Sequence, residues 1–263
     1  MKVFLTGASS GIGLATASLL AERGHQVWGT SRDLARLPKI EGLHLVALDL
    51  NNASSLRAIF QNALAEAGDH FDVVINNAGS GYFGPAESLS SEELTRHFQV
   101  LVFGQIELMH LALQSMRQKG SGLVINITSL ASRLPVPFMA AYNSAKAALA
   151  SYTMSVQLEL PNKNVRLVDL QPADINTSFN DVVTRAKTDD ARVDRAWQAT
   201  DRHMKAAPKP ELVAKRILKL IEQSDPAPRL TVGDSFQAVI APLIFRFLPQ
   251  RVKLWGLRKF YKI

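Results

Sequence analysis

The chain has 263 residues, of which 47% are hydrophobic and 20% charged, a composition that excludes an intrinsically disordered protein. It contains no cysteine, which excludes disulfides, catalytic thiols and cysteine-ligated metals, so we expect no metal site and a cytoplasmic location. The net charge is +7, but residues 235–263 hold six of the 30 basic residues and no acidic residue. This charge is local and does not predict nucleic-acid binding.

Short apolar runs alternate with helical patterns along the chain, as in the βαβ units of a parallel sheet. Strands are predicted at residues 3–6, 26–30, 44–48, 72–75, 123–128, 165–170 and 229–232. Helices are predicted at residues 12–23, 52–67, 91–118, 140–160 and 211–223. The strands are almost continuously apolar, which is typical of a sheet with helices on both faces. We therefore expect an α/β protein with a doubly wound parallel sheet of about seven strands.

Residues 174–210 form the one long stretch without a predicted strand, and they are polar with both charge signs. A loop of this length inside a compact domain is more often a functional lid than a spacer. We therefore predict one domain over residues 1–263, with a substrate lid at about 174–210.

A glycine-rich turn, TGASSGIG, spans residues 6–13, between the first predicted strand and the first helix. Gly7 permits a tight turn, Gly11 lets the backbone approach a phosphate, and Gly13 lets the helix pack closely on the sheet. The free amides and the positive dipole end of that helix favour an anion. The turn therefore predicts a dinucleotide-binding site.

Four motifs together resemble the short-chain dehydrogenase/reductase family: the glycine-rich turn, Asn76-Asn77-Ala78-Gly79, Ser129, and Tyr142-x-x-x-Lys146. They occur between residues 3 and 177 in the family's order and at its usual separations. The resemblance implies a Rossmann-type sheet of seven strands and NAD(P)-dependent oxidation or reduction of an alcohol or carbonyl on a small molecule. It also implies a homo-oligomer, a dimer or tetramer, that pairs through the fourth and fifth helices.

Cofactor-binding residues follow from the turn and from the family's pattern. They are Gly7, Ser9, Ser10, Gly11, Ile12, Gly13, Ser31, Arg32, Asp49, Leu50, Asn76, Ala78, Gly79, Tyr142, Lys146, Pro172, Ile175 and Thr177.

The catalytic group must supply a proton, because hydride transfer to a carbonyl leaves an alkoxide. Tyr142 and Lys146 lie at i and i+4 on one face of a predicted helix, where the ammonium is expected to lower the tyrosine pKa. Tyr142 would then act as general acid in reduction and general base in oxidation. By resemblance, Ser129 binds the substrate oxygen with Tyr142, and Lys146 also holds the nicotinamide ribose. Thr128 is a rival to Ser129, but only Ser129 stands thirteen residues before the tyrosine.

One position departs from the family. The family usually has an asparagine in the long fourth helix that holds a proton-relaying water, and here Leu101 occupies that position. Leucine cannot bind the water, so the relay runs through other groups, turnover is slower, or the protein binds a cofactor with little catalysis. The alternative function is accordingly a cofactor-binding regulatory or scaffold protein.

The end of the second strand reads Gly29-Thr30-Ser31-Arg32. NAD-selective folds place a carboxylate there, whereas Ser31 is neutral and Arg32 suits the 2′-phosphate of NADP. Asp33 either pairs with Arg32 or caps the next short helix. We favour NADP(H) over NAD(H), with NAD(H) as the alternative.

The tail, residues 235–263, alternates basic and apolar residues. This composition fits an interfacial helix attracted to anionic lipid, or a segment that closes the domain and lines the substrate entrance. We favour the second interpretation, with peripheral membrane contact through the tail as the less favoured alternative, and expect no nucleic-acid binding. Apolar residues close to the catalytic motifs indicate a lipophilic carbonyl or alcohol as substrate; they are Leu130, Val136, Phe138, Met139 and Phe179.

Overall fold

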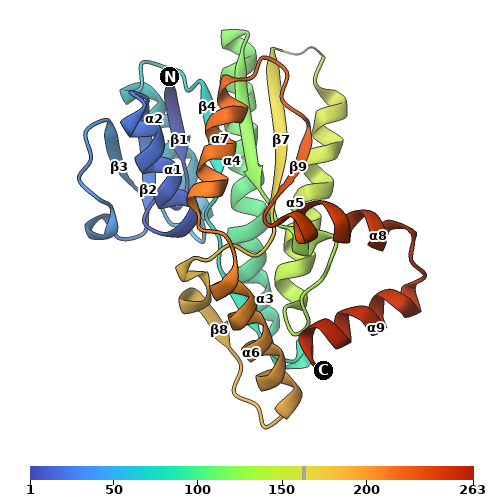
Figure 1. The fold of residues 1–263 in the computed structure, drawn as a ribbon. Coiled ribbons are helices and arrows are strands. Elements are labelled where there is room, and N and C mark those ends of the chain that lie inside the picture. Colours follow the sequence, from blue (N-terminus) through green and yellow to red (C-terminus); the bar gives the residue numbers. More distant parts are fainter. Residues whose placement is uncertain (162–163) are drawn as a thin grey trace.

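The computed structural model describes residues 1–161 and 164–263. Within them a parallel sheet has the strand order β3-β2-β1-β4-β6-β7-β9 (Figure 1). The strands are β1 (Lys2–Leu5), β2 (Gln26–Ser31), β3 (Leu43–Ala47), β4 (Val73–Asn76), β6 (Gly122–Ile127), β7 (Val165–Pro172) and β9 (Arg229–Val232). The predicted parallel sheet of seven strands is confirmed for these residues, and each strand lies within two residues of its predicted bounds.

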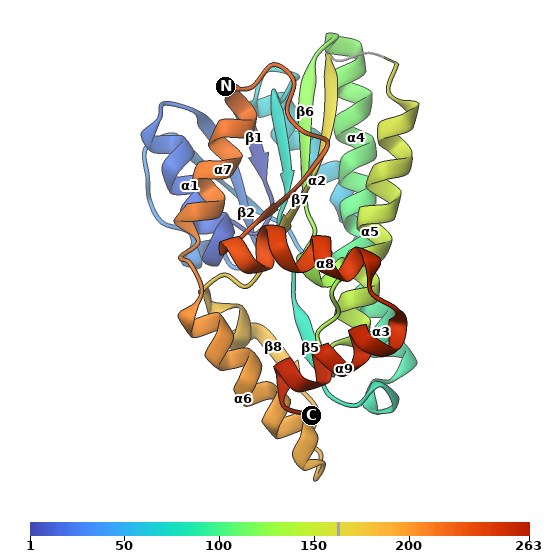
Figure 2. The ribbon, with the colours of Figure 1, turned by 45° about the vertical axis from the view of Figure 1, so that its right-hand side comes forward.

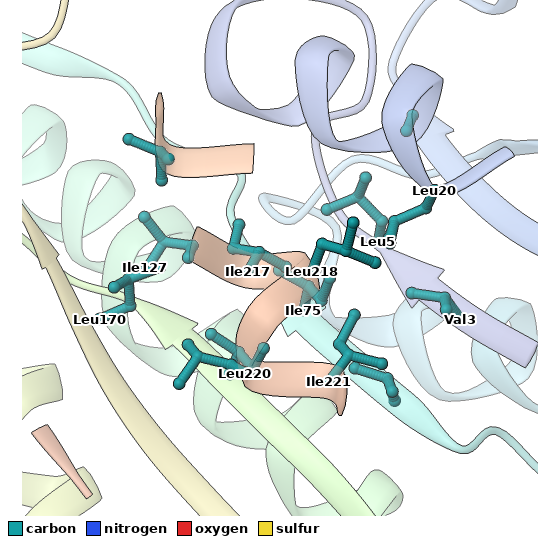
Figure 3. Packing of buried hydrophobic residues seen from close by; sticks show 14 of the residues in the cluster. Val3, Leu5, Leu20, Ile75, Ile127, Leu170, Ile217, Leu218, Leu220 and Ile221 are labelled. Atoms are coloured by element: carbon teal, nitrogen blue, oxygen red, sulfur yellow. The ribbon is translucent and has the colours of Figure 1, made fainter. Parts of the chain in front are cut away.

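Helices cover both faces of this sheet (Figure 2). One face carries α1 (Gly11–Glu22) and α7 (Glu211–Glu222), and the other carries α2 (Ala53–Glu66), α4 (Gly104–Lys119) and α5 (Ala140–Glu159). Side chains along a strand alternate between the two faces of the sheet. Val3 and Leu5 therefore pack in the core under α1 and α7, and Phe4 packs in the core under α2, α4 and α5. Figure 3 shows Val3 and Ile75 in the same cluster as Ile217 of α7. The doubly wound α/β fold is therefore confirmed.

The long helix predicted over residues 91–118 is confirmed, but its winding changes part of the way along it. The chain forms α3 (Ser91–Phe98), a π-helical segment η3 (Gln99–Phe103) and then α4. The Gln99 side chain donates a hydrogen bond to the Leu50 carbonyl over 3.2 Å. A Cβ on Gly104 would lie 3.3 Å from that same carbonyl oxygen. The wider turn thus brings the start of α4 into contact with the loop after β3. The spacing of apolar residues in the sequence does not reveal this tertiary contact.

The stretch at residues 174–210 contains regular structure that the sequence analysis missed. The strand β8 (Val183–Arg185) pairs in parallel with β5 (Gly81–Phe83) in a separate two-stranded sheet. The helix α6 (Ala191–Ala206) follows it. Small residues at Ala196 and Ala199 supply much of the buried face of α6, which explains why no apolar stripe was visible.

The tail forms a π-helical segment η6 (Phe236–Ile240), α8 (Ala241–Phe247) and α9 (Gln250–Tyr261). Pro249 separates the two α-helices, because proline cannot continue α8 and its φ of −59° suits the residue before a helix. Figures 1 and 2 show α8 and α9 at the same end of the sheet as α3 and α6. Among the described helices none has the length and apolar character needed to cross a membrane.

A buried carboxylate joins the last strands of the sheet. Asp169 of β7 accepts hydrogen bonds from the Thr128 hydroxyl, from Gln171 Nε2 at 2.8 Å and from Arg229 Nε at 2.7 Å. The Asp169 side chain is only 1% exposed, whereas that of Arg229 is 35% exposed. The ion pair therefore compensates a charge that has almost no access to water.

We expect Arg229→Ala to lower the free energy of unfolding by about 3 kcal/mol, because removing one partner of a buried pair typically costs roughly 3–5 kcal/mol. Arg57→Ala is the matched control, since the side chains of the Arg57–Glu107 pair are 54% and 36% exposed. It should cost about 1 kcal/mol or less. Denaturant titration followed by circular dichroism measures both values, and equal losses would contradict this account of Asp169.

Candidate active site

One cavity of about 1080 Å³ lies at the carboxyl ends of the strands. Its walls come from the loops after β1, β2, β3, β4, β6 and β7, from the segment at residues 174–210, and from the tail. The strand order reverses between β1 and β4, so the cavity lies where open α/β sheets bind their ligands.

The glycine-rich turn forms one wall of this cavity. Gly7 has φ +70° and a Cβ there would lie 2.9 Å from Ala78 Cα, so this position requires glycine. Ser10 precedes α1, and in the described part of the chain its hydroxyl caps none of the helix amides. These amides therefore remain available for an anion, and the turn fits a nucleotide diphosphate. Gly13 was predicted to contact the cofactor but does not line the cavity: a Cβ on it would lie 2.0 Å from the Gly7 carbonyl oxygen.

Asn76 is a second correction to the cofactor-binding set. It is fully buried, and its Nδ2 donates to the Gln105 carbonyl at 3.0 Å and to Asn126 Oδ1 at 2.9 Å. Its neighbour Asn77 lines the cavity instead, and Asn77 Nδ2 donates to the Thr6 and Gly7 carbonyls at 3.0 and 3.2 Å. The two adjacent asparagines therefore have different positions: Asn76 is enclosed in the core while Asn77 supports the glycine turn.

The loops after β2 and β3 line another part of the cavity. Arg32 lies there, and Asp33 does not pair with it among the ion pairs of the described residues. Asp33 Oδ1 accepts a hydrogen bond from the Ala35 amide at 3.0 Å and caps the 3₁₀ turn η1 (Leu34–Arg36). Of the two roles predicted for Asp33, capping the next short helix is therefore confirmed. Arg36, which the sequence analysis did not single out, also lines the cavity. Two arginines thus line this part of the cavity.

Most of the other predicted residues also line the cavity. Those not yet described are Ser9, Gly11, Ile12, Ser31, Asp49, Leu50, Ala78, Gly79, Pro172, Ile175 and Thr177, together with Ser129, Tyr142 and Lys146. Gly13 and Asn76 are the two predicted residues that do not. The arrangement therefore fits a dinucleotide lying across the carboxyl ends of the strands.

Ser129 Oγ accepts a hydrogen bond from the Ala131 amide at 3.1 Å. Burial raises the pKa of Tyr142 and the Ser129 hydroxyl partly opposes that rise, so the two hydroxyls lie close together. The rival hydroxyl, that of Thr128, donates to the buried Asp169 carboxylate and is thereby engaged in the sheet. Ser129 is consequently the hydroxyl that shares a site with the tyrosine.

The pKa values of Tyr142 and Lys146 are dominated by burial. Burial raises the pKa of Tyr142 to about 12 and lowers that of Lys146 to about 8. The expectation that Lys146 would lower the tyrosine pKa is therefore wrong for this structure. Lys146 Nζ lies 6.0 Å from the Tyr142 ring centroid and donates to the Ile127 carbonyl at 2.7 Å, so the ammonium is directed to the backbone rather than to the phenol. At neutral pH the phenol is protonated and can donate a proton.

Leu101, at the position of the family's relay asparagine, is fully buried in a cluster with Val102 and Ala145, against which Tyr142 packs. One turn earlier, His97 lines the cavity, and within the described structure its buried Nε2 has no hydrogen-bond partner. Burial, and then the charge of Lys146, lower the pKa of His97 to about 4, so the ring is neutral at neutral pH. The sequence analysis missed His97; its spacing of four residues from Leu101 on one helix was the available signal.

The remaining cavity wall is largely apolar. Leu130, Val136, Met139 and Phe179 line it as expected. Phe138 does not line it, because its ring packs on Phe83 with centroids 6.0 Å apart. The tail adds further apolar lining residues, among them Ile244, Phe245, Leu257 and Phe260. The tail therefore lines the cavity, and its part in a substrate entrance stays a prediction.

Comparison with known proteins places the chain in a family. The family described as short chain dehydrogenase matches residues 1–188. A 3-ketodihydrosphingosine reductase from Bacteroides thetaiotaomicron is 30% identical over 99% of this chain and 98% of its own length. An NADPH-dependent 1-acyldihydroxyacetone phosphate reductase from Schizosaccharomyces pombe is 32% identical over 67% of this chain and 60% of its own length.

Solved structures agree with this placement. A short-chain dehydrogenase from Streptomyces avermitilis has a TM-score of 0.83 at 25% identity, covering 99% of this chain and 97% of its own. An alcohol dehydrogenase from Thermococcus sibiricus complexed with 5-hydroxy-NADP has a TM-score of 0.73 at 27% identity, covering 89% and 97%. The chain therefore belongs to the short-chain dehydrogenase/reductase family, and it is an oxidoreductase that acts on carbonyl or alcohol groups with a nicotinamide cofactor.

Proposed function

We propose that the protein reduces a ketone or aldehyde on a lipophilic molecule, with NADPH as the hydride donor and Tyr142 as the proton donor. The observation that carries this proposal is the placement of Ser129, Tyr142 and Lys146 on one cavity whose remaining wall is largely apolar. The nicotinamide supplies the hydride when it is bound. The protein's own side chains then have to hold the carbonyl oxygen and provide the proton.

Ser129 and Tyr142 line the same cavity and lie close together, so a carbonyl oxygen placed between them meets two hydroxyl donors. Because the pKa of Tyr142 is raised to about 12, the phenol keeps its proton at neutral pH and releases it as the alkoxide develops. This protonation state supports reduction as the working direction. Lys146 keeps donors beyond the one given to the Ile127 carbonyl, and these can orient the cofactor ribose. We propose that His97, which lines the cavity and has a free Nε2 within the described structure, helps to link Lys146 with water where Leu101 cannot.

NADPH is the proposed cofactor because Arg32 and Arg36 both line the cavity beside the loop after β2, where an NAD-selective protein carries an acid. The S. pombe relative is NADPH-dependent by name, and the T. sibiricus structure holds an NADP derivative. These comparisons support the choice that the charge arrangement suggests.

A lipid-like substrate is proposed for two reasons. The names of the two relatives specify a 3-ketodihydrosphingosine and a 1-acyldihydroxyacetone phosphate, both of which are ketones on lipids. The cavity also extends from the catalytic hydroxyls to Phe179 of the proposed lid and to Leu257 and Phe260 of the tail, which can receive an acyl chain.

The second candidate is a cofactor-binding protein with little catalysis. It is favoured by Leu101, which closes the family's relay position with an apolar side chain. Under this function NADPH binds but carbonyl compounds are not turned over.

Tyr142→Phe tests the choice between these two functions. We expect reduction of long-chain ketones to fall by at least about 100-fold, because a general acid contributes roughly 10²–10⁴-fold, while the dissociation constant of NADPH changes little. Tyr152→Phe is the matched control on the same helix, since the Tyr152 hydroxyl contacts His110 and does not line the cavity. NADPH consumption over a panel of ketones measures the rates. A wild-type protein that binds NADPH and reduces no member of the panel would support the second candidate.

The pH dependence of NADPH binding tests the role of Lys146. Its pKa of about 8 means that the ammonium is charged below this pH and neutral above it. We expect the affinity for NADPH to fall as the pH rises above about 8, with the carbonyl-reduction rate falling in parallel. Fluorescence titration of NADPH between about pH 7 and about pH 10 measures the affinity without substrate. A constant affinity over this range would show that Lys146 does not hold the cofactor through its charge.

Arg32→Asp tests the cofactor preference. A charge-assisted hydrogen bond is worth roughly 1.5–3 kcal/mol, so we expect the affinity for NADP(H) to fall about ten- to a hundredfold, with NAD(H) unchanged or tighter. Arg23→Asp makes the same change of charge at an exposed residue just after α1, outside the cavity, and should leave both affinities unchanged. Wild-type protein that binds NAD(H) as tightly as NADP(H) would refute the preference.

A further inference from the structure

The tail carries an unusual concentration of exposed apolar side chains. Ten of the nineteen exposed large hydrophobic residues in the described chain lie between Phe236 and Phe260. Phe247 is 76% exposed, Trp255 64%, Val239 64% and Leu243 59%. Exposed large apolar side chains gathered in one short segment are typical of interaction sites, so the tail is a candidate for one.

The same surface is positively charged. Arg246, Arg251, Arg258 and Lys259 are exposed on α8 and α9, and residues 235–263 contain no acidic residue. None of the ion pairs found among residues 1–161 and 164–263 involves these four side chains. We call the exposed residues Val239, Leu243, Arg246, Phe247, Arg251, Leu254, Trp255, Arg258 and Lys259 the tail face.

Helix α9 carries part of this face on one side and lines the cavity with another. Arg251, Leu254, Trp255 and Arg258 follow the spacing of three and four residues that places side chains on one side of a helix. Leu257 and the buried Tyr261 line the cavity from the same helix. The tail face and the cavity wall are thus two sides of one element.

The tail is anchored, so its outer face is a built surface rather than a frayed end. Gln237 Nε2 donates to Asp174 Oδ2 at 2.8 Å, and the Asp174 amide donates to Gln237 Oε1 at 3.0 Å. At the other end, Phe260 packs on His203 of α6 with ring centroids 4.4 Å apart. These contacts fix the inner side of the tail and leave the tail face to solvent.

We infer that the tail face docks on the surface of an anionic lipid bilayer. Aromatic and aliphatic side chains interleaved with arginine and lysine are the composition of interfacial helices, whose apolar residues enter the headgroup region while the cations meet lipid phosphates. A second copy of this chain is a poorer occupant, because it would bring a second all-positive face against the first. Met154 and Leu158 of α5 are 49% and 85% exposed, so a second copy could instead bind at this other apolar surface.

Docking would place the apolar cavity wall of α9 directly behind the membrane-bound face. A ketone carried on a lipid could then pass between bilayer and cavity with little exposure to water. This consequence rests on the proposed function, whereas the docking itself does not.

Sedimentation with vesicles tests the docking with the full chain and without cofactor or substrate. The vesicles are phosphatidylcholine alone, or phosphatidylcholine mixed with phosphatidylglycerol. We expect the protein to sediment with the phosphatidylglycerol vesicles at low salt, to be released as salt rises, and to bind the neutral vesicles far more weakly. Because no turnover is measured, failure of docking and failure of the proposed reductase activity are separate results.

Matched variants locate the surface. Arg251→Gln, Arg258→Gln and Lys259→Gln combined should lower the partition coefficient at least about tenfold, from the attraction of roughly three screened charges. The control combines Lys215→Gln, Arg216→Gln and Lys219→Gln, three exposed cations of α7 outside the cavity, and should have a much smaller effect. Phe247→Ser with Trp255→Ser should weaken binding and keep its salt dependence, whereas Met154→Ser with Leu158→Ser should not weaken it.

Three results would overturn the inference. In the first, the intact protein stays in the supernatant with phosphatidylglycerol vesicles at low salt. In the second, the two sets of charge variants lose binding equally. In the third, gel filtration shows a dimer that Phe247→Ser with Trp255→Ser dissociates, which would assign the tail face to a second copy. The first result needs no variant, so the inference is tested even if a variant does not fold.

Discussion

The parallel sheet is covered by helices on both faces, and this constraint determines where chemistry can occur. Strand side chains point into one apolar core or the other, as Phe4 does on one side and Val3 on the other. Polar groups that meet a ligand are therefore placed beyond the carboxyl ends of the strands, in the loops there and, for Tyr142 and Lys146, on the part of α5 that faces the cavity. The glycine turn, Ser129 and Thr177 all lie in such loops and line the same cavity.

Lys146 and Asp169 are the charged groups that this constraint leaves buried, and their energies are linked. Burial lowers the pKa of Lys146, while the charge of Asp169 opposes that effect. Asp169 in turn depends on Arg229 at the start of β9, to which it is joined at 2.7 Å. The protonation state of a cavity residue is thus tied to an ion pair between two strands of the sheet.

The sequence was sufficient for features that depend on local pattern and insufficient for those that depend on distant contacts. The strands were predictable because burial on both faces demands continuous apolar runs. The four motifs located the glycine turn, Ser129, Tyr142 and Lys146 on the cavity, which are a minor part of its lining. The sequence could not show that Asn77 rather than Asn76 lines the cavity, because this depends on which of the two adjacent side chains points into the core at the end of β4. The raised pKa of Tyr142 was missed for a similar reason: it comes from burial by elements far away in the chain. The pairing of β8 with β5 likewise joins segments about a hundred residues apart.

The π-helical segment η3 between α3 and α4 has a consequence for how this family member can change. A π turn holds one residue more than an α turn, and each residue advances a helix by about 100°. His97 lies before η3 and meets the cavity, while Gln105 lies after it and donates to the Ala78 carbonyl at 2.7 Å. Loss of a single residue within η3 would restore regular winding and rotate one of these side chains away from its present partner. A one-codon deletion is therefore an evolutionary step that could re-orient a cavity-lining residue while leaving the strands on either side in register.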